Sequence, residues 1–184
     1  MIWKSYSHLK GTHAFLSPSR YHWLNYSPEK LVIAYENYRR IELGTRYHRV
    51  AEELISLFIR LPNTAESLNS FVNDAIGFQM KSEVVLYYSP HCFGTADAIS
   101  FRDGVLRIHD LKTGKTPGVM QQLMVYAGLF VLDYSIDPRE LKKIVLRIYQ
   151  NEEILEAKPE PSEIMYVCEQ IKHSDQLIND LLGE

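Results

Sequence analysis

The sequence has few cysteines and no long apolar run. Only Cys92 and Cys168 occur among its 184 residues. Two thiols are too few for a disulfide framework, a four-cysteine zinc site or a cysteine-ligated iron–sulfur cluster. No apolar stretch approaches the ~18 residues that span a bilayer. The first residues hold no apolar segment of the secretory type, but they are basic and free of acids, so a transit peptide stays open. We expect a cytoplasmic protein with no iron–sulfur cluster and no membrane partner.

Marks of several specialised architectures are also missing. There is no internal repeat, low-complexity tract or Gly/Ser linker, and TGKT at 113–116 lacks the upstream glycine of a nucleotide-binding P-loop. Apolar residues make up 46% and charged residues 23%, as in soluble globular proteins. A chain of this length fits one domain and can bury a substantial core. We therefore expect a single domain over residues 1–184.

Charge is unevenly distributed along the chain. The net charge is −3, but residues 1–49 carry eight basic and three acidic side chains, whereas residues 133–184 carry six and twelve. The same first quarter holds six of the twelve tyrosines and both tryptophans. A basic, aromatic segment is typical of a surface that binds a nucleic-acid backbone and its bases. It is equally compatible with a tyrosine-rich helix packed on the core, so charge alone leaves both interpretations open.

Hydrophobic periodicity and turn residues predict an α/β (α+β) fold. Its central mixed sheet has about four strands and is flanked by helices. A helical N-terminal part covers residues 1–62, the main core covers 83–150, and a C-terminal helix covers 162–182. Expected helices lie at 17–26, from Ser27 to Gly44-Thr45, from Thr45 to Leu61, within 63–80, and at about 119–132; expected strands lie at 83–89, 94–102, 105–112 and 142–150.

Asp103-Gly104 between two apolar, β-branched segments is a strong signal for a two-residue hairpin turn. If the loop has two residues, counting back from it sets Asp97 opposite Asp110. Facing Cβ atoms in an antiparallel pair are about 4.5–5.5 Å apart. Lys112 lies two residues beyond Asp110 and shares its face. The turn therefore predicts two carboxylates and one ammonium on one patch of sheet.

Such a patch suits a divalent metal. Paired carboxylates are the ligands that Mg²⁺ or Mn²⁺ takes, with waters and substrate phosphates completing the shell. The metal would activate water, and a neighbouring lysine would orient that water and stabilise the developing charge. The alternative is an ordinary ion pair between Asp110 and Lys112 on a solvated strand. The apolar neighbours argue against a solvated face: Ala96, Ala98, Ile108 and Leu111.

Four segments in order resemble one enzyme family. They are GTRYHRVAEELI at 44–55, GTAD at 94–97, DLKTG at 110–114, and MQQLMVYAG at 120–128. Together they resemble the PD-(D/E)XK nuclease superfamily, in its RecB-like exonuclease branch, which reads G-x-x-x-H, G-x-x-D, a hairpin, D-x-K-T-G and then Q-x-x-x-Y. The resemblance implies a restriction-endonuclease-like core and covers roughly residues 12–150.

The resemblance also implies roles for individual residues. It makes Asp97, Asp110 and Lys112 catalytic, the two aspartates being metal ligands together with His48 and the Leu111 carbonyl. It places Gln122, Tyr126 and Thr113 against the substrate backbone, and Glu83 as a supporting acid. Ser19 and Arg20, in SPSR, would meet a phosphate. Simpler interpretations stay open for three of them: a helix histidine for His48, a core aromatic for Tyr126 and a helix cap for Ser19.

The implied activity is that of a Mg²⁺- or Mn²⁺-dependent DNA exonuclease. The type is a phage-like stand-alone nuclease of recombination or repair, with a single-strand annealing protein as a possible partner and a homo-oligomer as a possible assembly. Two alternatives use the same segments: a structure-selective endonuclease, and a catalytically silent DNA-binding module. A zinc site from His91, Cys92, Cys168 and His173 lacks any family spacing.

Overall fold

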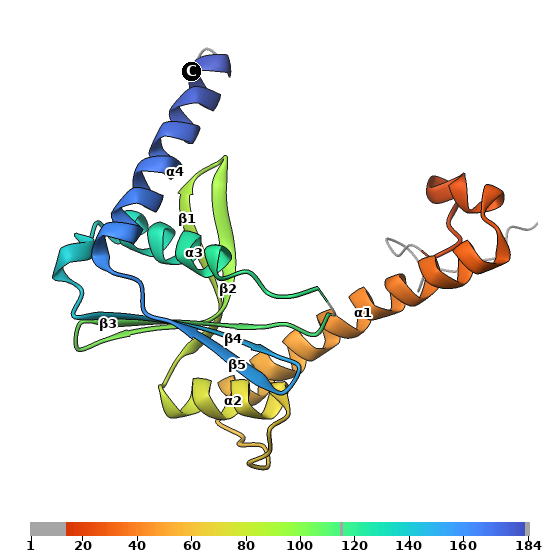
Figure 1. The fold of residues 1–184 in the computed structure, drawn as a ribbon, viewed down its shortest axis with the longest axis horizontal. Helices are drawn as coiled ribbons and strands as arrows, with labels where there is room; N and C mark the ends of the chain where they lie inside the picture. Colours follow the sequence, from red (N-terminus) through yellow and green to blue (C-terminus); the bar gives the residue numbers. More distant parts are fainter. Residues whose placement is uncertain (1–13, 115, 183–184) are drawn as a thin grey trace, which may run out of the picture. The chain divides into compact units, whose positions relative to one another are not determined.

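The computed structural model describes residues 14–114 and 116–182. They separate into two compact units, one up to Leu43 and one from Gly44 on, and each is described by itself. The boundary falls inside helix α1 (Pro28–Ser56), a continuous helix of 29 residues (Figure 1). The expected break at Gly44-Thr45 is therefore wrong. A glycine inside a helix costs about 1 kcal/mol relative to alanine, and burial of Ala51 and Ile55 outweighs that cost.

The first unit contains the short 3₁₀ helix η2 (Pro18–Asn25) and the beginning of α1. Phe15 packs on two tyrosines of α1, with ring centroids 5.1 Å from Tyr35 and 5.5 Å from Tyr38. These three aromatic rings therefore pack against one another inside the unit. The side chains of Ser19 and Arg20 lie outside the described residues, and the expectation of a phosphate contact there stays a prediction.

The second unit is built on a five-stranded mixed sheet with strand order β1-β2-β3-β4-β5. Only β3 and β4 pair in parallel, joined by a helical crossover; the other neighbours are antiparallel. The α/β class with a mixed sheet is thus confirmed, but the expected number of strands is one too low. The strands are β1 (Lys81–Ser89), β2 (Cys92–Arg102), β3 (Val105–Leu111), β4 (Lys143–Gln150) and β5 (Glu153–Ala157).

The strand missed from the sequence is β5, a short edge strand. Its sequence, EILEA, is mostly exposed and carries two glutamates, so it lacks the buried apolar alternation that identifies a strand. Charged residues on a short edge are a common device against edge-to-edge pairing. Asn151 and Glu152 both have positive φ and close the hairpin from β4.

Helices cover the two faces of the sheet. Helix α2 (Ser67–Gly77) contacts β3 and β4 on one face, and α3 (Met120–Asp133) packs on the other (Figure 1). Helix α4 (Pro161–Leu182) lies against α3 and against the short 3₁₀ helix η3 (Pro138–Glu140). No helix in the described part of the chain is long and apolar enough to cross a bilayer.

The β2–β3 turn has the two residues expected of it. Asp103 and Gly104 have φ of 51° and 80°, the pair of positive values that a type I′ turn requires. The ladder then runs from Arg102–Val105 to Ala98–His109. This confirms the predicted register, whose next position brings Asp97 opposite Asp110.

Candidate metal centre

Three carboxylates form one row across the first three strands. Glu83 lies between the pairs Ser82–Ala98 and Val84–Ala96, so it is the neighbour of Asp97 across β1 and β2. Asp110 is the neighbour of Asp97 on the other side, by the register of β2 and β3. The hairpin turn explains the second pairing; the first depends on the β1–β2 connection, which has no comparable sequence signal.

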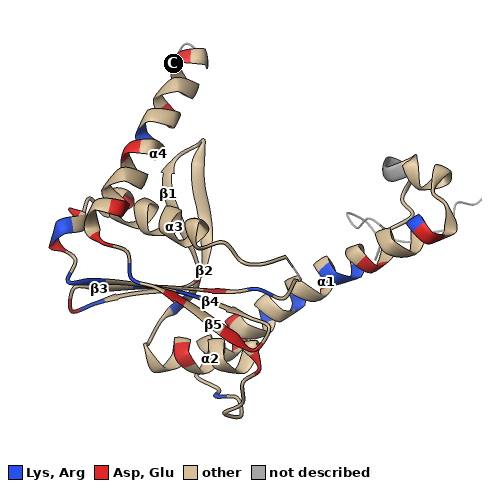
Figure 2. Cartoon of the chain, viewed as in Figure 1, with Lys and Arg blue, Asp and Glu red and all other residues tan. Residues whose placement is uncertain are grey.

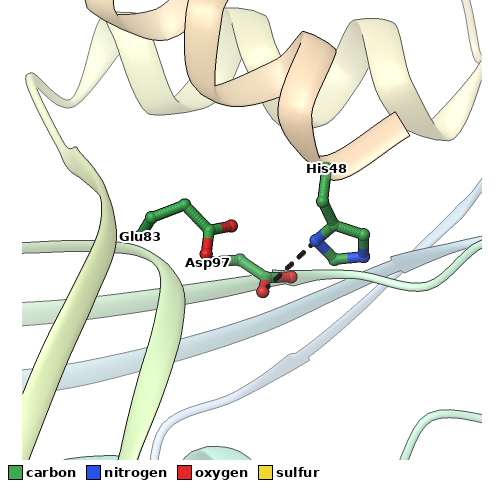
Figure 3. A group of neighbouring side chains, drawn as sticks. All are labelled: His48, Glu83 and Asp97. Atoms are coloured by element: carbon green, nitrogen blue, oxygen red, sulfur yellow. Dashed lines mark ion pairs between the residues drawn. The ribbon is translucent and has the colours of Figure 1, made fainter. Parts of the chain in front are cut away.

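Asp97 is the centre of this row. Its Oδ2 accepts a 2.8 Å hydrogen bond from the backbone N–H of Leu111, and its Oδ1 lies 3.4 Å from Nδ1 of His48 on α1 (Figure 3). The backbone bond fixes the carboxylate, and the imidazole reaches it from the helix. Leu111 thus approaches the site through its backbone, while its side chain is buried in the core.

His48, Glu83 and Asp97 make a group of potential metal ligands. One ligand atom from each lies within 4.8 Å of the other two. Figure 3 shows the side chain of Glu83 extending toward Asp97 and His48. Glu83 has a φ of 51°, a left-handed conformation that costs a non-glycine residue roughly 1–2 kcal/mol. Strain of this kind is concentrated at functional sites.

The electrostatics of the group favour a cation. The hydrogen bond to Asp97 raises the pKa of His48. Burial raises the pKa of Glu83, and the nearby Asp97 raises it further. The repulsion between Glu83 and Asp97, and the attraction of both for a charged His48, indicate an excess of negative charge here. A divalent ion bound there would reverse that balance.

Asp110 and Lys112 form the second half of the site. Lys112 Nζ donates to Asp110 Oδ1 at 3.1 Å and to Gln122 Oε1 on α3 at 3.0 Å. Asp110 is buried, and burial together with the Asp97 charge raises its pKa. Its Oδ2 is 3.0 Å from the same lysine nitrogen but, among the described residues, it has no hydrogen bond of adequate geometry.

The residue set fits a divalent metal. Carboxylate and imidazole ligands suit Mg²⁺ or Mn²⁺, and the buried Asp110 Oδ2 leaves an acceptor without a directed partner. His48, Glu83 and Asp97 would hold the ion, with Asp110 bordering them. Glu83 is thus closer to the centre of the group than a supporting acid, whereas Asp110 is engaged by Lys112.

Two glycines allow close approach around the site. A Cβ on Gly44 would lie 2.8 Å from Thr113 Oγ1, so α1 meets the loop after β3 at that point. A Cβ on Gly94 would lie 3.0 Å from Cε1 of Tyr126. Because neither glycine has a Cβ, Gly44 leaves room for the exposed side chain of Thr113, and Gly94 leaves room for the half-buried ring of Tyr126.

Tyr126 shares its helix face with Gln122. Burial raises the pKa of its phenol, and the nearby amide of Gln122 lowers it to a smaller extent. Because Gln122 also accepts from Lys112, a chain of polar contacts leads from Asp110 to α3. These residues are brought together as the sequence pattern predicted; their contact with a substrate stays a prediction.

Gln150 is a positioning residue that the sequence analysis missed. Its Oε1 accepts from the N–H of Gly118 at 2.9 Å, and its Nε2 donates to the carbonyls of Gly114 and Thr116 at 2.7 and 2.8 Å. It is buried at the end of β4. A single amide thus fixes the loop that follows Lys112. The signal in the sequence was a polar glutamine directly after the largely apolar segment KIVLRIY.

The opposite face of β3 carries a buried polar network. Tyr149 Oη donates to Asp74 at 2.7 Å and lies 3.0 Å from Nδ1 of His109. Since the hydroxyl has one proton, Nδ1 of His109 is the donor to it, and Nε2 is an acceptor without a partner among the described residues. Burial, and then the charge of Arg147, lower the pKa of His109 to about 3.

The zinc alternative receives no geometric support. Within the described residues, the sole group with metal-binding spacing is His48, Glu83 and Asp97. Cys168 is buried, and its Sγ is 3.7 Å from the carbonyl of Gly128, to which it donates. Burial raises the pKa of both thiols, which disfavours the thiolate that zinc requires.

A family model and a solved structure are similar to parts of this chain. A family model described as a protein of unknown function (DUF2800) matches residues 82–154. That segment contains the carboxylate row and Lys112 but not His48. The crystal structure of SSO0001 is 16% identical, with 71% of this chain and 68% of that chain covered and a TM-score of 0.29. Similarity at this level does not define a shared fold. A search of curated proteins gives no match.

Proposed function

We propose that this protein is a Mg²⁺-dependent deoxyribonuclease that hydrolyses phosphodiester bonds from DNA ends. The observation that carries the proposal is the row of Glu83, Asp97 and Asp110, with His48 beside it and Lys112 at its end. The resemblance to RecB-like nucleases supplies DNA as the substrate. We place the activity in the cytoplasm, in phage or bacterial recombination and repair.

Each residue of the site has a task in this reaction. A bound divalent ion would supply an activated water and neutralise phosphate charge. His48, Glu83 and Asp97 would hold that ion. The Lys112 ammonium, fixed between Asp110 and Gln122, would stabilise negative charge on the attacked phosphate. The N–H of Leu111 keeps Asp97 oriented during the reaction.

The test is a digestion series on DNA labelled at the 5′ or 3′ end, with Mg²⁺ or Mn²⁺. Linear duplex, linear single strand and closed circle are compared for the wild type, Lys112→Ala and Lys172→Ala. We expect metal-dependent loss of linear DNA, reduced roughly 10²–10³-fold in Lys112→Ala because a charge-stabilising donor is removed. Lys172→Ala removes an exposed lysine of α4 and should digest normally.

Other outcomes distinguish the remaining interpretations. Cleavage of the closed circle identifies an endonuclease rather than an exonuclease. DNA binding without cleavage in either metal identifies a binding module. Full activity of Lys112→Ala contradicts the proposed mechanism.

A further inference from the structure

Cations that form no ion pair with any residue that the structure describes gather around the β2–β3 turn and the beginning of the neighbouring strand β1. Figure 2 shows Lys and Arg where β3 and β4 begin. Among the described residues, none of the ion pairs involves a member of this group. We call the group the turn-end surface; its members are Lys81, Arg102, Lys142 and Lys143, all exposed.

The backbone brings these side chains together. Arg102 and Lys143 are the partners of Val105 on its two sides, in β2 and β4. The N–H of Lys142 donates to the carbonyl of Gly104 at 2.9 Å, and its side chain lies over that glycine. Asp103 of the turn contributes one negative charge. The surface is therefore strongly positive on a chain whose net charge is −3.

A cavity of about 580 Å³ adjoins the turn-end surface. Lys81 and Arg102 line it together with aromatic residues of β2, of α3 and of the position directly after α3. Phe101 is 42% exposed and Tyr134 58% exposed, and Phe130 packs between them with centroid distances of 5.4 and 4.9 Å. Exposed rings beside cations provide stacking faces next to sites for phosphate.

Charge distinguishes this cavity from three others of similar size. A second cavity, between α3 and α4, holds Arg139 and Lys172 but also Asp137 and Glu169. A third, beside α4, is lined by Glu163 and Asp175 without Lys or Arg, and a fourth, in the first unit, is lined by Glu36. Of these four, the cavity at the turn-end surface is lined by cations without an acid.

We propose that the turn-end surface binds a single DNA strand, with phosphates on Lys81 and Arg102 and a base stacked on Tyr134, all three of which line the cavity. Groove cations with adjoining aromatic rings are the combination that binds single strands without sequence preference. Arg102 is five positions beyond Asp97 in β2, a distance of ~16 Å along an extended strand. The assignment deepens the proposed function, on which it rests for the choice of DNA as the polymer.

The test measures binding in EDTA, so that cleavage plays no part. A labelled single strand of about 15 nucleotides is titrated between about 50 and 200 mM salt. The double variant Lys81→Gln/Arg102→Gln is compared with Arg139→Gln/Lys172→Gln, which also removes one arginine and one lysine. We expect the first to lower the slope of log affinity against log salt by about 1.4, because two phosphate contacts are lost, and the second to leave it unchanged.

Tyr134→Ala tests the base contact separately, and circular dichroism checks that every variant is folded. We expect roughly tenfold weaker binding of the normal strand and no change for an abasic strand of the same length. Equal salt slopes for the two double variants would overturn the proposal, as would displacement of the strand by inorganic phosphate at matched phosphate concentration. A wild type that binds DNA in this way but never cleaves it refutes the nuclease and retains the strand site.

Discussion

At the residue scale, the carboxylate of Asp110 is buried against the charge of Asp97, and its pKa is raised. The folded state therefore holds a proton on this acid more tightly than the unfolded state does. The resulting penalty is absent below the ordinary pKa of 3.8. It grows as the pH rises through the folded-state pKa and is complete above it. At neutral pH the metal-free protein carries this penalty in full.

Replacing Asp110 with a neutral residue should therefore raise stability and lower activity. We expect Asp110→Asn to increase the free energy of unfolding of metal-free protein at pH 7 by on the order of 1 kcal/mol, and to abolish cleavage. Denaturation in EDTA measures the first effect and digestion of linear DNA the second. Adding Mg²⁺ should stabilise the wild type more than the variant, because ligand binding to the native state favours folding. A variant that is less stable in EDTA contradicts this account.

At the element scale, α1 places Gly44 close to the loop that carries Thr113, and the absence of a Cβ on this glycine leaves room for the threonine side chain. An exposed or semi-exposed glycine inside a helix is normally improved by alanine, by roughly 1 kcal/mol. Here the added methyl would lie 2.8 Å from Thr113 Oγ1, so the gain in helix stability competes with displacement of the loop.

We expect Gly44→Ala to reduce DNA cleavage in the wild-type background and to reduce it much less in a Thr113→Ala background. The contact is removed in the second case, so the double-mutant cycle should show a coupling of about 0.5–3 kcal/mol. Cleavage rates of the four proteins measure it. Additive effects would show that the two residues act independently.

The elements also show what could be predicted from sequence. The turn at Asp103-Gly104 could be predicted because few other residue pairs readily adopt two positive φ values. The pairing of Asp97 with Asp110 followed from that turn. The predicted helix break at Gly44 was wrong because the free-energy cost of a glycine in a helix is smaller than the stabilisation from residues that α1 buries. Glu83 could not be placed centrally, since its position depends on the register of β1. Gln150 acts on backbone atoms more than thirty residues away, and no local pattern records such a contact.

At the scale of the whole molecule, His109 links stability to pH. Its pKa of about 3 lies below the ordinary value of 6.5 because the ring is buried. Its contribution to stability is therefore complete above pH 6.5 and is lost as the pH falls from 6.5 toward 3. His48, with a raised pKa, acts in the opposite direction: its contribution is present below 6.5 and is lost as the pH rises through its folded-state pKa.

Comparison with His109→Asn isolates the buried ring, because the His48 contribution is common to both proteins. The amide of asparagine preserves a donor toward Tyr149 and does not titrate. We expect the wild type to lose about 2 kcal/mol more than the variant between pH 6.5 and pH 5. Urea denaturation in EDTA at several pH values measures the difference. If the free energy of unfolding depended on pH in the same way for the two proteins, the folded protein would accommodate the charged imidazolium of His109.

The position of Gln150 has a consequence for the chain as it is synthesised. Asp97, Asp110 and Lys112 leave the ribosome well before the amide that holds their loop, since β4 follows the α3 crossover. A nascent or prematurely terminated chain ending before β4 carries every acid of the row and still lacks an ordered loop after Lys112. If the chain is the nuclease proposed above, incomplete products would be unable to cleave DNA, and cleavage would begin only once β4 has joined the sheet.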